Sequence, residues 1–199
     1  MRRISCSAFL IGSLIYLSSC QKDSSDTPAN NGITGNYKFG SLTASTVSTA
    51  IVSDGITVDK TVTYSDYITK NNKGTLVIDD KNITTKDLSY SIDTTVRVYF
   101  YEDGSLIDSE VSDFQFDVPA SSATSGYNRV TNDSIYVTSG SMFFNGTAAT
   151  TDPVGVRYKM EGDKLHIYAS KTQTRQEIQN GYLVTQELKA SVDVMYQKQ

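Results

Sequence analysis

The stretch that decides the fold is Tyr182-Leu183-Val184-Thr185-Gln186-Glu187-Leu188-Lys189-Ala190-Ser191-Val192-Asp193-Val194-Met195-Tyr196. Apolar residues and tyrosines occupy most of its even positions, and polar residues occupy most of its odd positions. Successive side chains of a β-strand point to opposite faces, so this alternation predicts one long strand with one apolar face. A straight strand of this length would measure about 50 Å. We therefore expect it to coil or bend within a domain of ordinary size.

The same alternation recurs along most of the chain. It is found in the segments Ile56–Tyr64, Leu88–Ile92, Val96–Phe100, Phe114–Val118, Val154–Met160 and Leu165–Ala169. No segment shows the 3.6-residue period of an amphipathic helix. The chain has 13 Tyr and 3 Pro, no Trp, and abundant Thr, Ser and Val, a composition that favours strands. The sequence thus predicts an all-β protein of about ten strands, joined mostly by hairpins.

Turn signals divide these segments. Asp103-Gly104 and Asn180-Gly181 each separate two alternating runs and favour tight hairpin turns. Turns are also expected at Asn71–Gly74 and Glu161–Asp163, and the longest irregular stretch is expected at Ala120–Thr131. Between Leu106 and Val118 the apolar residues change from odd to even positions, which predicts a β-bulge near Ser112.

Long, hairpin-linked antiparallel strands are the ones that close an up-and-down barrel. We predict a single antiparallel up-and-down β-barrel of about 8–10 strands over residues 34–199. The alternative is a two-sheet β-sandwich, which uses the same short-turn patterning.

The N-terminus has the layout of a bacterial secretory signal peptide. Arg2 and Arg3 precede an apolar stretch from Ile4 to Leu17, which is shorter than the roughly 20 residues that span a bilayer as a helix. The stretch ends in Leu17-Ser18-Ser19-Cys20, which resembles the lipobox of bacterial lipoproteins. The resemblance implies that residues 1–19 are cleaved and that Cys20 carries acyl chains such as palmitate. Gln21, rather than Asp, follows Cys20 and favours the outer membrane of the cell envelope.

The segment that follows predicts a tether. Residues 20–33 are rich in Ser, Asn, Asp, Thr and Pro, as flexible linkers are. Cys6 leaves with the signal peptide and Cys20 is acylated, so neither thiol nor disulfide chemistry is expected. Without Arg2 and Arg3 the formal net charge falls from −4 to −6. A surface of this charge repels phosphate, so nucleic acid is not an expected partner.

Two further motifs resemble the lipocalin-like barrels of bacterial lipoproteins. Gly35-Asn36-Tyr37-Lys38 stands where that family has Gly-x-Trp at its first strand, and Tyr158-Lys159-Met160-Glu161-Gly162-Asp163-Lys164-Leu165 is similar to its penultimate hairpin. The resemblance covers about Ile33 to the C-terminus. It implies a calyx for a small apolar or amphipathic molecule, with Arg175 the nearest candidate for the late arginine that packs on the first-strand aromatic residue.

Catalytic patterns are absent from the sequence. It contains no P-loop, no Gly-rich phosphate loop and no serine nucleophile elbow. His166 is the only histidine, alternates with Leu165 and Ile167, and is expected to be an exposed strand residue without an orienting partner. Asp113, Gln115 and Asp117 are expected to form a solvated stripe rather than a calcium site. We expect a non-enzymatic protein without cofactor or metal.

The tyrosines at apolar positions are the candidate ligand-lining residues. They are Tyr37, Tyr64, Tyr90, Tyr158, Tyr182 and Tyr196. As core residues they would fill a barrel that lacks Trp, and as a site they would line a cavity. Three functions follow: a lipid-anchored protein that binds a small apolar or amphipathic molecule, a surface glycan-binding or adhesion module, or a structural envelope lipoprotein without a ligand. The oligomeric state is left open.

Overall fold

The structure, a computed structural model, describes residues 32–139 and 153–199. The described residues form nine strands: β1 (Gly35–Ser53), β2 (Val58–Ile68), β3 (Lys70–Ile78), β4 (Asn82–Glu102), β5 (Ser105–Thr131), β6 (Ser134–Val137), β7 (Val154–Glu161), β8 (Lys164–Gln179) and β9 (Tyr182–Lys198). Every strand pairing is antiparallel, which confirms the all-β prediction. The predicted signal peptide, Cys20 and most of the predicted tether lie outside the described residues.

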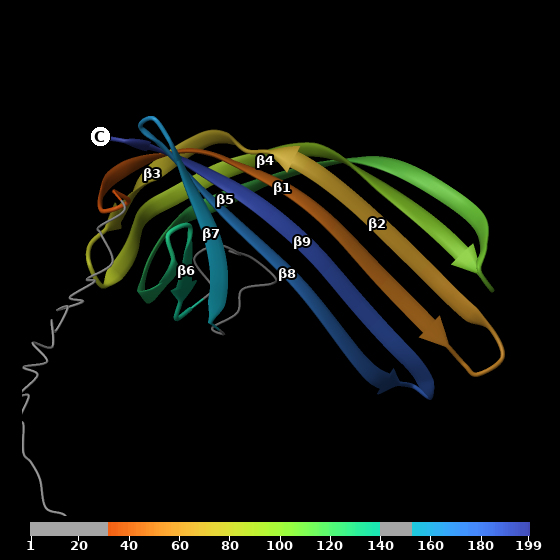
Figure 1. Ribbon diagram of the computed structural model, residues 1–199. Helices are drawn as coiled ribbons and strands as arrows, with labels where there is room; N and C mark the ends of the chain where they lie inside the picture. Colours follow the sequence, from red (N-terminus) through yellow and green to blue (C-terminus); the bar gives the residue numbers. More distant parts are fainter. Residues whose placement is uncertain (1–31, 140–152) are drawn as a thin grey trace, which may run out of the picture.

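The strands form one up-and-down sheet that closes on itself. From β3 to β9 each strand pairs with the next one along the chain, and β9 pairs back with β1. β2 and β3 follow each other along the same side of β1 and together act as one long strand. Figure 1 shows the resulting ring. We call the part of the molecule where β3, β6 and β7 complete this ring the closed end. The prediction of a single antiparallel up-and-down sheet is therefore confirmed.

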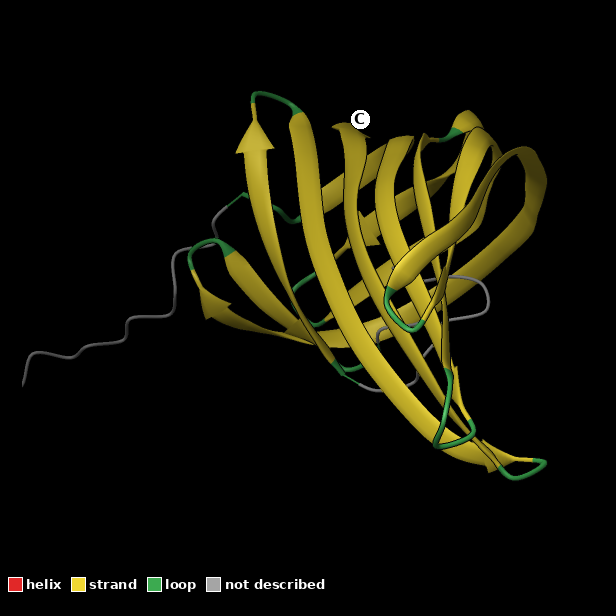
Figure 2. Ribbon diagram, turned by 90° about the vertical axis from the view of Figure 1, so that its right-hand side faces the viewer, coloured by secondary structure: helices red, strands yellow, loops and turns green. Residues whose placement is uncertain are grey.

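Beyond the closed end the sheet is open. β6 and β7 have only 4 and 8 residues, whereas β1, β4, β5, β8 and β9 have between 16 and 27. The long strands therefore continue past the ring as a curved sheet in the order β5-β4-β2-β1-β9-β8, which we call the open sheet. Figures 1 and 2 show these strands arching away from the ring. Their curvature fulfils the expectation that strands this long must bend.

Two of the three hairpin turns of the open sheet follow the sequence prediction. Asp103 and Gly104 have φ values of 46° and 83°, and Asn180 and Gly181 have φ values of 52° and 86°. Two consecutive residues with positive φ make the turn whose twist matches that of paired strands. These dipeptides therefore join β4 to β5 and β8 to β9 by tight turns, and the ladder of β8 and β9 has no register shift.

Two local predictions in β5 are wrong. The register between β4 and β5 is unbroken from Tyr90–Val118 to Phe100–Asp108, so no bulge lies near Ser112. Both faces of β5 meet water here, and Val111 stays 68% exposed, so apolar residues need not share one face. The stretch Ala120–Thr131 is not irregular but belongs to β5 and pairs with β4 and β6. Pairing with β4 and β6 satisfies the backbone hydrogen-bonding groups of this stretch, although its polar side chains are typical of a loop.

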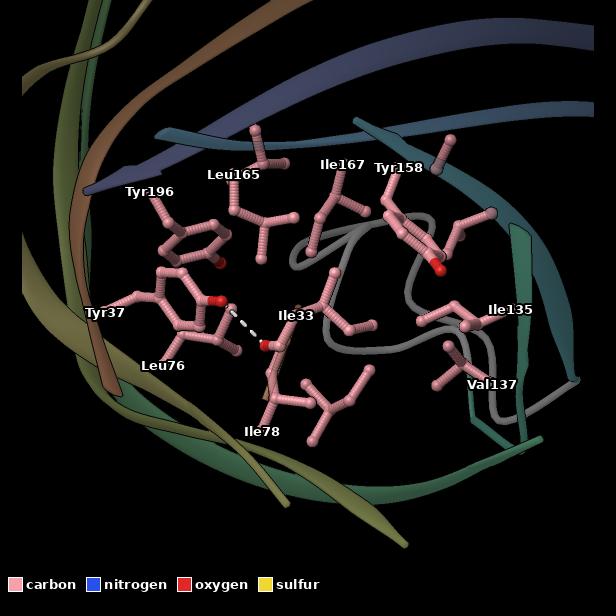
Figure 3. Packing of buried hydrophobic residues seen from close by; sticks show 14 of the residues in the cluster. Ile33, Tyr37, Leu76, Ile78, Ile135, Val137, Tyr158, Leu165, Ile167 and Tyr196 are labelled. Carbon is pink, nitrogen blue, oxygen red and sulfur yellow. Dashed lines mark hydrogen bonds between the residues drawn. The ribbon is translucent and has the colours of Figure 1, made fainter. Parts of the chain in front are cut away.

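The hydrophobic core fills the closed end. Its fully buried side chains are those of Ile33, Tyr37, Leu76, Ile78, Ile83, Ile135, Val137, Val156, Leu165, Ile167 and Tyr196. Figure 3 shows most of them pointing toward one another from the two sides of the ring. The Tyr37 hydroxyl donates a hydrogen bond of 2.7 Å to the carbonyl of Ile33, drawn in the same figure. Ile33 was the last residue of the predicted tether, and it instead begins the packed domain.

The segment between β2 and β3 joins the closed end to the open sheet. Thr69 is buried, and its Oγ1 accepts a 2.9 Å hydrogen bond from the Leu42 amide. The Asn72 side chain donates a hydrogen bond of 2.7 Å to the Gly40 carbonyl. This bond fixes the additional residues between β2 and β3 to the neighbouring strand β1. The predicted turn at Asn71–Gly74 is thus a bulge within a continuing ladder, because β2 and β3 pair with the same strand on the same side.

Candidate binding site

Four of the six candidate tyrosines fill the closed end. Tyr37, Tyr158 and Tyr196 are 0%, 6% and 2% exposed, and Tyr90 packs against them with its ring centroid 6.0 Å from that of Phe39. Burial raises the pKa of Tyr90 to about 12 and raises the pKa of Tyr196 as well, because a phenolate is poorly solvated there. These side chains serve as core in a chain that has no Trp.

The other two candidate tyrosines are far from that core. Tyr64 is 39% exposed, and its ring meets Tyr99 edge-on at 5.7 Å. Tyr182 is 47% exposed and begins β9 at a hairpin turn. The structure therefore does not gather the six tyrosines around one cavity. Arg175 does not pack on Tyr37 either, since it lies on the open part of β8 and forms a 2.6 Å ion pair with Glu177.

A hollow lies where the core ends. It has a volume of about 780 Å³ and is lined by residues of β1, β2, β4, β7, β8 and β9. None of the six candidate tyrosines is among them, whereas Tyr67 and Tyr168 are. Ala44 and Ala169, which also line the hollow, are the last small members of the core. Their size explains why packing stops here.

The polar residues of the hollow come from two neighbouring rows of paired residues. The first row runs Ile68, Thr43, Asp193, Tyr168, Arg157, and the second runs Asp66, Ser45, Ser191, Ser170. Side chains in such rows share one face of the sheet. These residues alternate with Ala44 and Ala169, so their side chains leave the face opposite the core. The hollow opens on the core face, so the row that lies between these two rows forms its floor: Tyr67, Ala44, Val192 and Ala169. Its exposed lining is therefore mostly apolar.

Two residues of the first row, Arg157 and Asp193, have charged or hydrogen-bonding partners. Arg157 forms a 2.8 Å ion pair with Asp133, and the pKa of Asp133 is lowered by hydrogen bonds from Thr131 and Arg157. Asp193 lies 3.1 Å from His166 Nδ1, and the His166 ring stacks against Tyr168 at 6.1 Å. Partial burial, with Asp193 and Glu161 nearby, raises the pKa of Tyr168. The row therefore presents an aromatic ring between an anchored guanidinium and an anchored carboxylate.

His166 differs from its sequence prediction. Its side chain is only 18% exposed, and Asp193 supplies the orienting partner that the sequence did not reveal. The two residues are 27 positions apart and meet because β8 and β9 pair, with His166 opposite Met195 and Asp193 opposite Tyr168. Only knowledge of this register would have found the pair.

We also searched residues 32–139 and 153–199 for a metal site and for a helix that could span a membrane. No group of three or more His, Cys, Asp or Glu side chains there is placed to hold a metal ion. Of the predicted acidic stripe, Gln115 reaches Asp93 at 3.4 Å, and Asp93 is paired with Lys70 at 2.7 Å. No helix within these ranges is long and apolar enough to cross a membrane.

No protein-family model, no curated protein and no solved structure matches the chain. The fold and the chemistry of the hollow are therefore the basis for a proposed function.

Proposed function

We propose that this chain is a bacterial envelope lipoprotein, held at the outer membrane by acyl chains on Cys20, whose domain binds a small apolar or amphipathic molecule. The basic, apolar and Leu17-Ser18-Ser19-Cys20 segments support the anchor. Two or more acyl chains anchor a protein stably, so no further membrane segment is needed. The up-and-down sheet supports the lipocalin-like interpretation of the domain.

The observation that carries the ligand proposal is the lining of the hollow. Its volume of about 780 Å³ falls within the range of roughly 300–1,000 Å³ that is typical of small-molecule sites. Tyr67, Ala44, Val192 and Ala169 form its floor, so most of its lining is apolar. Such a lining suits an apolar or amphipathic ligand, because burying apolar surface is favourable whereas burying an unpaired polar group is costly.

Tyr67 gives the hollow a polar group that can orient an amphipathic ligand. It pairs with Ala44 on the core face and lines the hollow. Burial raises the pKa of Tyr67, so its hydroxyl stays protonated and can donate a hydrogen bond. Among the three functions that the sequence predicts, this lining favours the binding of a small apolar or amphipathic molecule.

The test is native mass spectrometry of the full chain, extracted with its lipid from its own envelope. We expect a bound small apolar or amphipathic molecule. Val192→Trp should abolish this adduct by filling the hollow, because the Val192 side chain lies on its floor. Ser191→Trp is the matched control, because its side chain leaves the opposite face of the same strand. Circular dichroism checks that both variants fold, and an adduct that survives Val192→Trp would place the ligand elsewhere.

A second candidate function, glycan binding, is favoured by one exposed aromatic residue on the opposite face of the sheet. The Tyr168 ring is 38% exposed and lies between Arg157 and Asp193 in the same row of paired residues. An aromatic face can pack on a sugar ring, and the charged neighbours can bond to its hydroxyls. A sugar adduct lost in Tyr168→Ala but kept in Tyr136→Ala, where Tyr136 is 44% exposed, would support this second function.

A further inference from the structure

The open sheet has two free edges. Among the described residues, β5 pairs only with β4 between Ser105 and Val118, and β8 pairs only with β9 between Thr172 and Gln179. Backbone groups on the outer side of both stretches therefore have no neighbouring strand. Such an edge is a ready template for another strand unless it is short, charged with Lys or interrupted by Pro. In Figure 1, β8 and the green β4–β5 pair bound the two sides of the open sheet.

The edge of β5 has little of the usual protection, which is limited to one bulge at Ile107. Pro119 follows it, but residues 105–118 contain neither Pro nor Lys. Its large apolar side chains are substantially exposed, at 56% for Leu106, 60% for Ile107, 68% for Val111, 44% for Phe114 and 52% for Phe116. Exposed apolar side chains along an unpaired edge are typical of a surface that is covered in an assembly.

The two edges carry opposite charge. Residues 105–118 of β5 contain Asp108, Glu110, Asp113 and Asp117 and no basic residue. Residues 171–179 of β8 contain Lys171 and Arg175 with a single acid, Glu177. The guanidinium of Arg175 contacts Glu177 but remains 66% exposed. Opposite charges on paired strands stabilise a seam, whereas like charges oppose it.

The register places the opposite charges at the same level. One row of paired residues crosses the whole sheet through Asp108, Phe100, Thr61, Ala50, Gln186 and Arg175. Asp108 and Arg175 are thus the two ends of one row and lie on the same face. The neighbouring row on the other face ends in Ser109 and Thr174.

The strand directions also match. β5 and β8 are the outer members of six alternating strands, so they run in opposite directions. A second copy in the same orientation would therefore place its β8 antiparallel to the β5 of the first copy. This arrangement continues the ladder and brings Asp108 of one copy to Arg175 of the next.

We propose that this protein associates head to tail with further copies of itself, by pairing the edge of β5 in one copy with the edge of β8 in the next. The contact uses two different surfaces, so it does not close after two copies and can add more. Acyl chains at Cys20 would confine the copies to one membrane surface and so favour such encounters.

Disulfide trapping tests the seam. Two full-length variants, Ser109→Cys and Thr174→Cys, carry different tags and are mixed in detergent under mild oxidation. We expect a disulfide that joins the two tags at several times the yield of the control, Asp80→Cys mixed with Thr174→Cys. Asp80 lies in the exposed turn between β3 and β4, away from both edges. A yield equal to that of the control would overturn the proposal.

Charge exchange tests the same seam without crosslinking. Sedimentation of the full chain should show association that rises with concentration. Asp108→Arg and Arg175→Asp should each weaken it about tenfold, and the double variant Asp108→Arg/Arg175→Asp should restore it. Asp80→Arg makes the same charge change outside the seam and should have no effect. A protein that is monomeric at all concentrations, or that associates equally in every variant, would contradict head-to-tail pairing, as would capture of an unrelated protein at the edge of β5.

Discussion

Tyr196 and Tyr182 lie on the same strand, on the same face and in the same alternating pattern, yet one is 2% exposed and the other 47%. Tyr196 lies in the closed end, where the opposite wall of the ring covers it. Tyr182 lies in the open sheet, where β6 and β7 do not reach. The comparison teaches that alternation specifies a strand with two faces, whereas burial requires a second wall across from it.

The largest expected difference between the two regions is the cost of removing a leucine. Leu165→Ala in the closed end should lower the free energy of unfolding by about 2–5 kcal/mol, because it leaves a cavity among packed side chains. Leu183→Ala in the open sheet should change it by less than about 0.5 kcal/mol, because Leu183 is 46% exposed. Urea unfolding of both variants measures this. Equal losses would mean that the open sheet is packed as tightly as the ring.

The next effect concerns the bulge that joins the regions. Gly74 has φ of 109°, and a Cβ there would lie 2.7 Å from the backbone oxygens of Lys86 and Asp87. Gly74→Ala should therefore cost about 2–3 kcal/mol through backbone strain and displacement of β4. Gly155→Ala, where a Cβ meets nothing within 4 Å, is the control and should be close to neutral. Thermal unfolding followed by circular dichroism compares them, and a neutral Gly74→Ala would show that β4 yields at this point.

A smaller effect is expected at Thr69. Thr69→Val removes the hydroxyl that accepts from the Leu42 amide and leaves that donor unsatisfied where Thr69 is 5% exposed, at a cost of about 1–2 kcal/mol. Thr172→Val on the exposed part of β8 makes the same chemical change and should have little effect. Hydrogen exchange at the Leu42 amide supplies a local measure: exchange as slow as in the unsubstituted protein would show that another acceptor takes over.

The smallest effect is one of pH, and it appears only in alkaline solution. Burial raises the pKa of Tyr90 in the folded protein to about 12, against about 10 for an exposed tyrosine, so the unfolded chain ionises first. Between pH about 10 and 12 the unfolded state therefore binds fewer protons, and the free energy of unfolding falls as pH rises. Below that range Tyr90 has no such effect. Tyr90→Phe should make the fall shallower, whereas Tyr182→Phe should not, as denaturant unfolding across this pH range would show.

Much of the fold follows from local pattern. Alternation located β9, and Asn180-Gly181 located its hairpin, because both signals are carried by residues adjacent in sequence. The pattern failed at Ala120–Thr131, a polar stretch that becomes strand only because β4 and β6 lie beside it. It also failed near Ser112, where apolar residues on both faces reflect exposure to water rather than a change of register.

The candidate site was less predictable than the fold. The sequence indicated six tyrosines at apolar positions as candidate ligand-lining residues, but four of them are part of the core in the closed end. The hollow instead lies over Tyr67, Ala44, Val192 and Ala169, which no local pattern marks as a site. Only the pairing of β1, β2, β8 and β9 brings these four residues into one row. That arrangement depends on long-range register and leaves no trace in any single segment.

The unbroken ladder between β8 and β9 has a consequence for how this chain can change. The pairs run from Lys164–Gln197 to Gln179–Tyr182 with no register shift, and the turn needs only Asn180 and Gly181. Matched deletions of two residues from each arm would shorten the hairpin while every remaining side chain kept its face. The reach of this arm is thus an adjustable length, which mutation could trim or extend in steps of two residue pairs without disturbing the ring below it.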